Sequence, residues 1–286
     1  MYLYNGLRKL GRGVLKHKAL FLLLILLQAL LLGLFMYITI TYQAAIFNTL
    51  QEIVQPLQTA NYDAQSIQQG EEFISQFAGI YLAYRSLIRQ IVLLAAWWLG
   101  LFLIVNGALW VLSHQLLEKS SWKSRGRQWI KYVAATILLL GPFLLAAYFI
   151  LKTALGAKID PDTFGPMLKY LLYFLGIIYY LMLHAFASLN AVSWEKFTKQ
   201  FFSTAIRKIH YTLPILTINL ILLSAAGYLI YYFLELNQNF ALMMGASALL
   251  IMALVLTRLY WIACLRELTA AEIAEPEEPH HEKSNS

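Results

Sequence analysis

The stretch ALFLLLILLQALLLGLFMYITITY, residues 19–42, decides the fold class because it is long, apolar and free of charged residues. The hydrocarbon core of a bilayer is about 30 Å thick, and a helix needs about 20 apolar residues to cross it. This stretch therefore predicts a membrane-spanning helix. Five further stretches are comparably long and apolar, at about residues 87–112, 132–151, 168–190, 213–234 and 241–264.

The apolar stretches are continuous, which indicates helices, because the strands of a membrane barrel would alternate apolar and polar residues. Only 13% of the residues are charged, against about 25% in soluble domains, so no sizeable soluble domain is expected. We predict an all-α, polytopic transmembrane helical bundle. Its six-helix domain covers residues 1–274, and a disordered cytoplasmic tail follows at 275–286.

Basic residues are distributed unequally between the two sides that six spans would define. Of the 22 Lys and Arg residues, 17 fall on the side that holds both chain ends. The positive-inside rule then places both termini in the cytoplasm, and we expect a multi-pass protein of the plasma membrane. The first apolar run is about twice as long as the core of a signal peptide, so we expect an uncleaved first helix.

Basic, amphipathic segments precede spans on the same side. Leucines and basic residues occupy different helical faces in residues 2–18, and 193–211 combines Trp and Phe with Lys and Arg. Such segments are typical of helices that lie on a membrane surface. We expect anionic headgroups of membrane lipids as partners on the cytoplasmic face, and no nucleic acid. The expected headgroup contacts are Arg8, Arg12, Lys16, Lys123, Arg125, Arg127, Lys196, Lys199, Arg207 and Lys208.

The segment between the first two spans, residues 43–86, has helical spacing of apolar residues at both ends and a polar centre. It predicts an outer helical hairpin that projects beyond the membrane. Its apolar face must be covered by itself, by the membrane surface or by a protein partner. Arg85 and Arg89 fall near the outer end of the second span, where we expect them to reach the headgroups or to pair with acids.

Few polar residues interrupt the spans, and none of them is an acid. Asn106, His184 and Asn219 are candidates for a polar path for transport, together with Pro142, which removes a backbone hydrogen bond in the third span. Each has a structural alternative, because Asn and His often hydrogen-bond between helices and Pro can produce a fixed bend. Arg258 is expected to mark the inner boundary of the last span.

The sequence lacks the motifs G-x-S-x-G, H-E-x-x-H, C-x-x-C and the P-loop. Its single cysteine, Cys264, cannot form an intrachain disulfide or a cysteine metal cluster. We expect no enzyme activity, no catalytic residue, no metal and no cofactor.

Three function classes remain open on these grounds. We favour a non-enzymatic scaffold or accessory subunit of a membrane complex. The alternative is a passive transporter or channel for ions or small molecules that uses the kinked third helix. A membrane enzyme acting on lipids ranks last, because paired acid and base groups are lacking.

Overall fold

The structure of the protein, a computed structural model, describes residues 2–59, 71–118, 121–156, 161–236 and 239–274. The elements it describes are all helical. Six helices are long and apolar enough to cross a membrane, so the predicted all-α class with six membrane-length helices is confirmed. The predicted tail, 275–286, and the polar tip of the hairpin, 60–70, lie outside the described residues.

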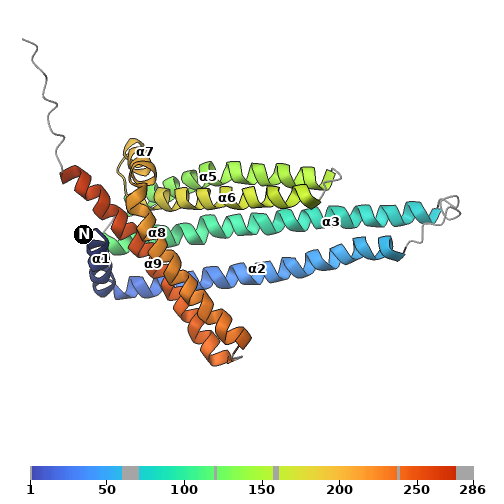
Figure 1. The fold of residues 1–286 in the computed structure, drawn as a ribbon, viewed down its shortest axis with the longest axis horizontal. Coiled ribbons are helices and arrows are strands. Elements are labelled where there is room, and N and C mark those ends of the chain that lie inside the picture. Colours follow the sequence, from blue (N-terminus) through green and yellow to red (C-terminus); the bar gives the residue numbers. More distant parts are fainter. Residues whose placement is uncertain (1, 60–70, 119–120, 157–160, 237–238, 275–286) are drawn as a thin grey trace, which may run out of the picture. The chain divides into compact units, whose positions relative to one another are not determined.

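The helices follow one another in the order of the apolar stretches, with three π-helical turns among them (Figure 1). α6 ends earlier than predicted, because residues 188–190 form a turn. The elements are α1 (Tyr2–Lys16), α2 (Lys18–Thr59), α3 (Glu71–Leu101), η2 (Phe102–Asn106), α4 (Gly107–Leu117), α5 (Trp122–Gly156), α6 (Pro161–Ala187), α7 (Trp194–Phe202), η3 (Ser203–Arg207), α8 (Ile209–Tyr231), η4 (Tyr232–Leu236) and α9 (Phe240–Ala274).

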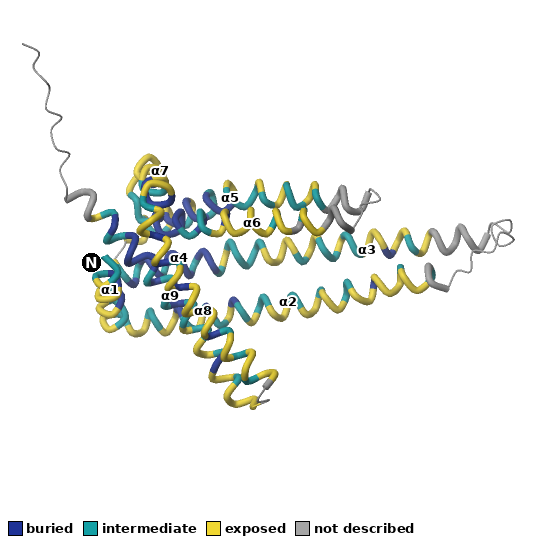
Figure 2. Tube along the Cα trace, viewed as in Figure 1, coloured by how far each residue is buried: buried dark blue, intermediate teal, exposed yellow. Residues whose placement is uncertain are grey.

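The chain forms two compact units, of which the first comprises residues 1–28 and 107–286 and the second comprises residues 29–106. In the first unit α5 packs on α6 and α8 packs on α9, and α1 lies against both α4 and α9. The largest fully buried side chains include Trp261 of α9 and Leu109 of α4. Dark blue segments mark this core in Figure 2.

Large apolar side chains point outward over much of the first unit. Leu138 of α5 is 75% exposed and Tyr170 of α6 is 70% exposed. A soluble protein rarely exposes such continuous apolar surface. A bilayer is the solvent that suits it, because lipid tails are as apolar as leucine.

α1 approaches α9 so closely that its contact surface has no room for a side chain at Gly6. A Cβ atom added there would overlap the Sγ of Cys264, and Cys264 is fully buried. Seven residues further on, a Cβ at Gly13 would lie 3.1 Å from Leu116 of α4. Glycine at both positions therefore lets α1 lie flat on its neighbours, which is how small residues act at helix contacts.

The second unit is an antiparallel pair formed by α3 and the rest of α2. Trp98 Nε1 donates to Thr39 Oγ1 at 3.2 Å, and Gln90 Nε2 donates to Thr49 Oγ1 at 3.1 Å. The earlier residue of α2, Thr39, thus pairs with the later residue of α3, Trp98. The later residue of α2, Thr49, pairs with the earlier residue of α3, Gln90. This register places the end of the first predicted span, at residue 42, level with about residues 95–97 of α3.

The same register relates Arg85 and Arg89 to the end of the first predicted span. Arg89 adjoins Gln90, whose partner Thr49 lies seven residues beyond residue 42 on α2. At 1.5 Å per residue, that is about 10 Å further along the helix. Arg85 and Arg89 are both exposed, and Arg85 lies over the ring of Tyr81, 6.0 Å from its centroid.

We predict that Gly6→Ala loosens α1 from α9, because the added methyl group meets Cys264 and overpacking of this kind costs about 1–3 kcal/mol. The single cysteine, Cys264, provides the measurement, since its reaction with a maleimide should become faster as α1 detaches. Gly11→Ala is the matched control, because nothing lies within 4 Å of a Cβ there. Equal labelling rates for Gly6→Ala and the parent would contradict the close contact.

Candidate functional site

The residues predicted to form a polar path are placed in separate environments. Pro142 is exposed on the surface of α5, which continues through it as one helix. Asn106 ends the π-helical turn η2 and is buried. His184 and Asn219 are also buried, but they bond to different neighbours.

His184 lies between two aromatic rings near the end of α6. Its ring centroid is 4.5 Å from that of Tyr180 and 5.1 Å from that of Trp261. Nδ1 lies 3.2 Å from Thr204 Oγ1, while Nε2 has no hydrogen-bond partner among the described residues. In α8, Asn219 Nδ2 donates to the carbonyl of Thr257 at 3.3 Å. Both side chains therefore link helices, which is the structural role that the sequence left open for them.

Arg258, which the sequence places at the inner end of the last span, contacts residues of α2 and α4. Its guanidinium lies over Trp110, 5.4 Å from the ring centroid, and donates to Gln28 Oε1 at 2.8 Å. The contact ties α9 to α2 and α4 inside the first unit. A charge placed this way is shielded from lipid by an amide and an aromatic face.

A buried polar network connects α4, α6 and α9 around His114. The carbonyl of Phe186 can only accept, so His114 Nε2, 2.8 Å away, carries the proton. Nδ1 then accepts from Nη2 of Arg266 at 2.7 Å. His114 thus joins the C-terminal end of α6 to α9 as a neutral imidazole with both ring nitrogens engaged.

The network continues outward through Glu118, which follows α4. Glu118 Oε2 accepts from Arg266 Nη1 at 3.2 Å and from Asn190 Nδ2 at 2.6 Å. Asn190 Oδ1 accepts from Gln128 Nε2 at 2.6 Å. The chain of contacts leads from the core to the surface and holds the turn after α6 in place. Sequence reasoning missed all these partners, because only the fold brings residues so far apart in the chain together.

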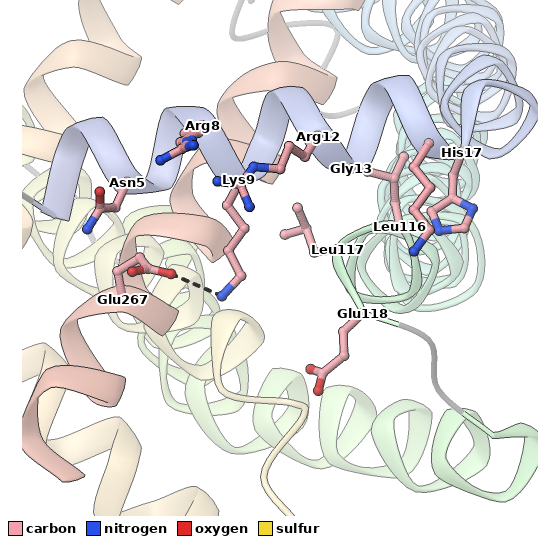
Figure 3. Close-up of a pocket in the computed structure, with 11 residues that line it drawn as sticks. Asn5, Arg8, Lys9, Arg12, Gly13, His17, Leu116, Leu117, Glu118 and Glu267 are labelled. Atoms are coloured by element: carbon pink, nitrogen blue, oxygen red, sulfur yellow. Dashed lines mark hydrogen bonds and ion pairs between the residues drawn. The ribbon is translucent and has the colours of Figure 1, made fainter. Parts of the chain in front are cut away.

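Beside this network lies a pocket of about 430 Å³. α1 and His17, which follows it, form one wall, α9 contributes Glu267, and the end of α4 with the following Glu118 completes the lining (Figure 3). Lys9 Nζ lies 3.1 Å from Glu267 Oε1. The lining residues are Asn5, Arg8, Lys9, Arg12, Gly13, Lys16, His17, Leu116, Leu117, Glu118 and Glu267.

Three of the predicted headgroup contacts, Arg8, Arg12 and Lys16, therefore meet in one pocket. The others are distributed over α5, α7 and the turn before α8. Lys123, Arg127, Lys196, Lys199 and Arg207 are exposed. Arg125 lies over Trp122, 5.2 Å from the ring centroid, and Lys208 donates to the carbonyl of Leu268 at 2.8 Å.

Among the residues that the structure describes, no group of three or more His, Cys, Asp or Glu side chains could hold a metal ion. Comparison with protein families, with curated proteins and with solved structures finds no match.

We predict that His114→Phe destabilises the protein, because it removes the buried hydrogen bonds that His114 makes with the carbonyl of Phe186 and with Arg266. A buried polar group that loses its partner costs about 1–3 kcal/mol. Unfolding in a mild detergent, followed by circular dichroism against temperature, measures the change. His210→Phe is the matched control, because His210 is exposed. Equal effects of the two substitutions would contradict a stabilising role for the network.

Proposed function

We propose that the protein is a non-enzymatic scaffold or accessory subunit of a membrane complex. It contacts anionic lipid headgroups with its basic segments and holds a protein partner with the hairpin formed by α2 and α3. In this proposal the protein lies in the plasma membrane, and both of its termini face the cytoplasm. The unequal distribution of Lys and Arg supports that orientation.

The observation that carries the proposal is the apolar surface of the hairpin beyond the expected membrane boundary. α2 has 42 residues, so it is about 63 Å long, roughly twice the thickness of a hydrocarbon core. Exposed Trp97 and Trp98 lie at about the level of residue 42. Tryptophan is enriched where a helix leaves the membrane, so the part of the hairpin beyond this level projects into water.

Apolar side chains are exposed on that projecting part. Phe47 of α2 is 59% exposed and Leu82 of α3 is 64% exposed. Exposed apolar patches outside a membrane commonly mark protein interaction sites. Further exposed apolar residues of this region are Leu50, Val54, Tyr81 and Tyr84.

A groove of about 490 Å³ lies between the two helices of the hairpin. It is lined mainly by apolar and small residues, with Glu52 and Ser86 as its polar members. A partner that inserts an apolar side chain beside this groove would cover the patch and leave the polar members at the rim, as in typical interfaces. The lining residues are Glu52, Pro56, Gly79, Ile80, Leu82, Ala83 and Ser86.

We predict that Leu82→Glu releases the partner without unfolding the hairpin, because the change places a charge in the exposed apolar patch. The size of the complex extracted from native membranes, measured on native gels, should fall toward that of the 32.7 kDa chain. Gln51→Glu is the control, since it adds the same charge at an exposed polar position of α2. A complex of unchanged size with Leu82→Glu would overturn this role of the hairpin.

Passive transport is the second candidate, and one observation favours it. His184 Nε2 and Asn219 Oδ1 are buried atoms without a hydrogen-bond partner among the described residues, and such atoms often accompany functional sites or bound water. Under this alternative, the two residues provide polar positions along a route through the bundle.

Liposomes that contain the purified protein test this alternative by the efflux of monovalent ions and small neutral solutes. Transport predicts efflux faster than from protein-free liposomes, and slower efflux with His184→Phe or Pro142→Ala. Efflux equal to that of protein-free liposomes would leave the scaffold as the remaining proposal.

A further inference from the structure

We propose that the pocket beside α1 binds the phosphate group of an anionic membrane lipid, with Arg8, Arg12 and Lys16 as its counter-ions. This site rests on the proposed function, because it assigns one defined location to the headgroup contacts proposed there. It is independent of the hairpin, so its failure would leave the proposed partner site untouched.

Three like charges form a row on α1. Arg8, Arg12 and Lys16 follow one another at intervals of four residues, so they lie along one helical face. Like charges at this spacing destabilise an isolated helix by about 0.2–0.5 kcal/mol per pair. None of the three forms an ion pair with a described residue. An anion in the pocket would offset this repulsion.

Two carboxylates, those of Glu118 and Glu267, line the same pocket. Glu267 pairs with Lys9 at 3.1 Å, so each neutralises the other. Glu118 is held by Arg266, at 3.2 Å, and by Asn190, which directs its charge toward the buried network. Neither acid is therefore left to compensate the row of three bases, and the pocket keeps an excess of positive charge.

The chemistry of the three cations matches that of a phosphate group. A guanidinium presents several N–H donors in a plane and binds phosphate oxygens in pairs, while a lysine ammonium adds a compact charge. Two arginines and a lysine along one wall suit a phosphate with several acceptor oxygens. The volume of about 430 Å³ lies within the usual range for small-ligand pockets.

The exposed apolar surface of α1 beside the pocket favours a lipid over a free phosphate. α1 exposes an apolar ridge next to its basic face, formed by Tyr4, Leu7 and Leu15, of which Tyr4 and Leu15 are 70% exposed. The membrane-length helix α2 begins at Lys18, directly after this ridge. An amphipathic helix in this position places its apolar face at the acyl boundary and its bases at headgroup level. A lipid bound there keeps its acyl chains beside the ridge while its phosphate enters the pocket.

The test uses the full-length protein in a neutral detergent, titrated with dioctanoyl phosphatidylglycerol, dioctanoyl phosphatidylcholine and inorganic phosphate, with binding followed by calorimetry. We expect the anionic lipid to bind at least tenfold more tightly than the other two probes. The double substitution Arg8→Gln with Arg12→Gln should weaken it roughly 30-fold, at about 1 kcal/mol for each base.

Lys196→Gln with Lys199→Gln is the matched control, because it removes the same charge from exposed positions of α7 outside the pocket. Leu117→Trp provides a second test, since it fills the pocket and keeps every charge. Circular dichroism and gel filtration verify that each variant is folded. Weaker binding with Leu117→Trp, and a loss for the α7 pair much smaller than the loss for the α1 pair, would support the site.

Equal losses for the α1 and α7 pairs would overturn the proposal in favour of unspecific charge attraction. Phosphate binding as tight as that of the anionic lipid would overturn the lipid assignment and leave a site for a free anion. Equal binding of the two lipids would also contradict it, because both carry a phosphate and only phosphatidylglycerol has a net charge.

Discussion

A membrane interior offers no water to a polar group, so every N–H and C=O within it must find a partner in the protein. Continuous helices satisfy this demand for the backbone, which is why all the described elements are helical. The same demand governs the side chains. His114 engages both of its ring nitrogens, and Arg258 is enclosed by Gln28 and Trp110. Polar residues in the first unit thus become links between helices.

Basic residues that look equivalent in the sequence divide into two groups in the structure. Arg266 and Lys208 direct their donors into the bundle, to His114 and to a backbone carbonyl. Arg8 and Arg12 remain at the surface of α1 without an ion pair among the described residues. The second group is therefore available to an external anion, and the first contributes to the fold. Counting positive charges would not separate them.

The two compact units support different proposals. In the first unit, α1, α4 and α9 enclose a charged pocket whose acids are already compensated. In the second, the register of α2 and α3 carries apolar residues such as Leu82 beyond the aromatic level at Trp97. One surface suits a lipid headgroup and the other suits a protein. We propose both as recognition surfaces, and we propose no chemistry for the chain.

The sequence by itself determined the helical class and the six membrane-length segments. A continuous apolar run can be read along the chain, and its length matches the thickness of a bilayer's hydrocarbon core. It also identified the bases of α1 as candidates for lipid contact, since amphipathic spacing can be read along the chain. It could not find the network of His114, Arg266 and Glu118, which joins residues up to 152 positions apart. Only tertiary packing decided which charges meet, which glycine lets α1 reach Cys264, and how far α2 and α3 project together, because these depend on distances between helices.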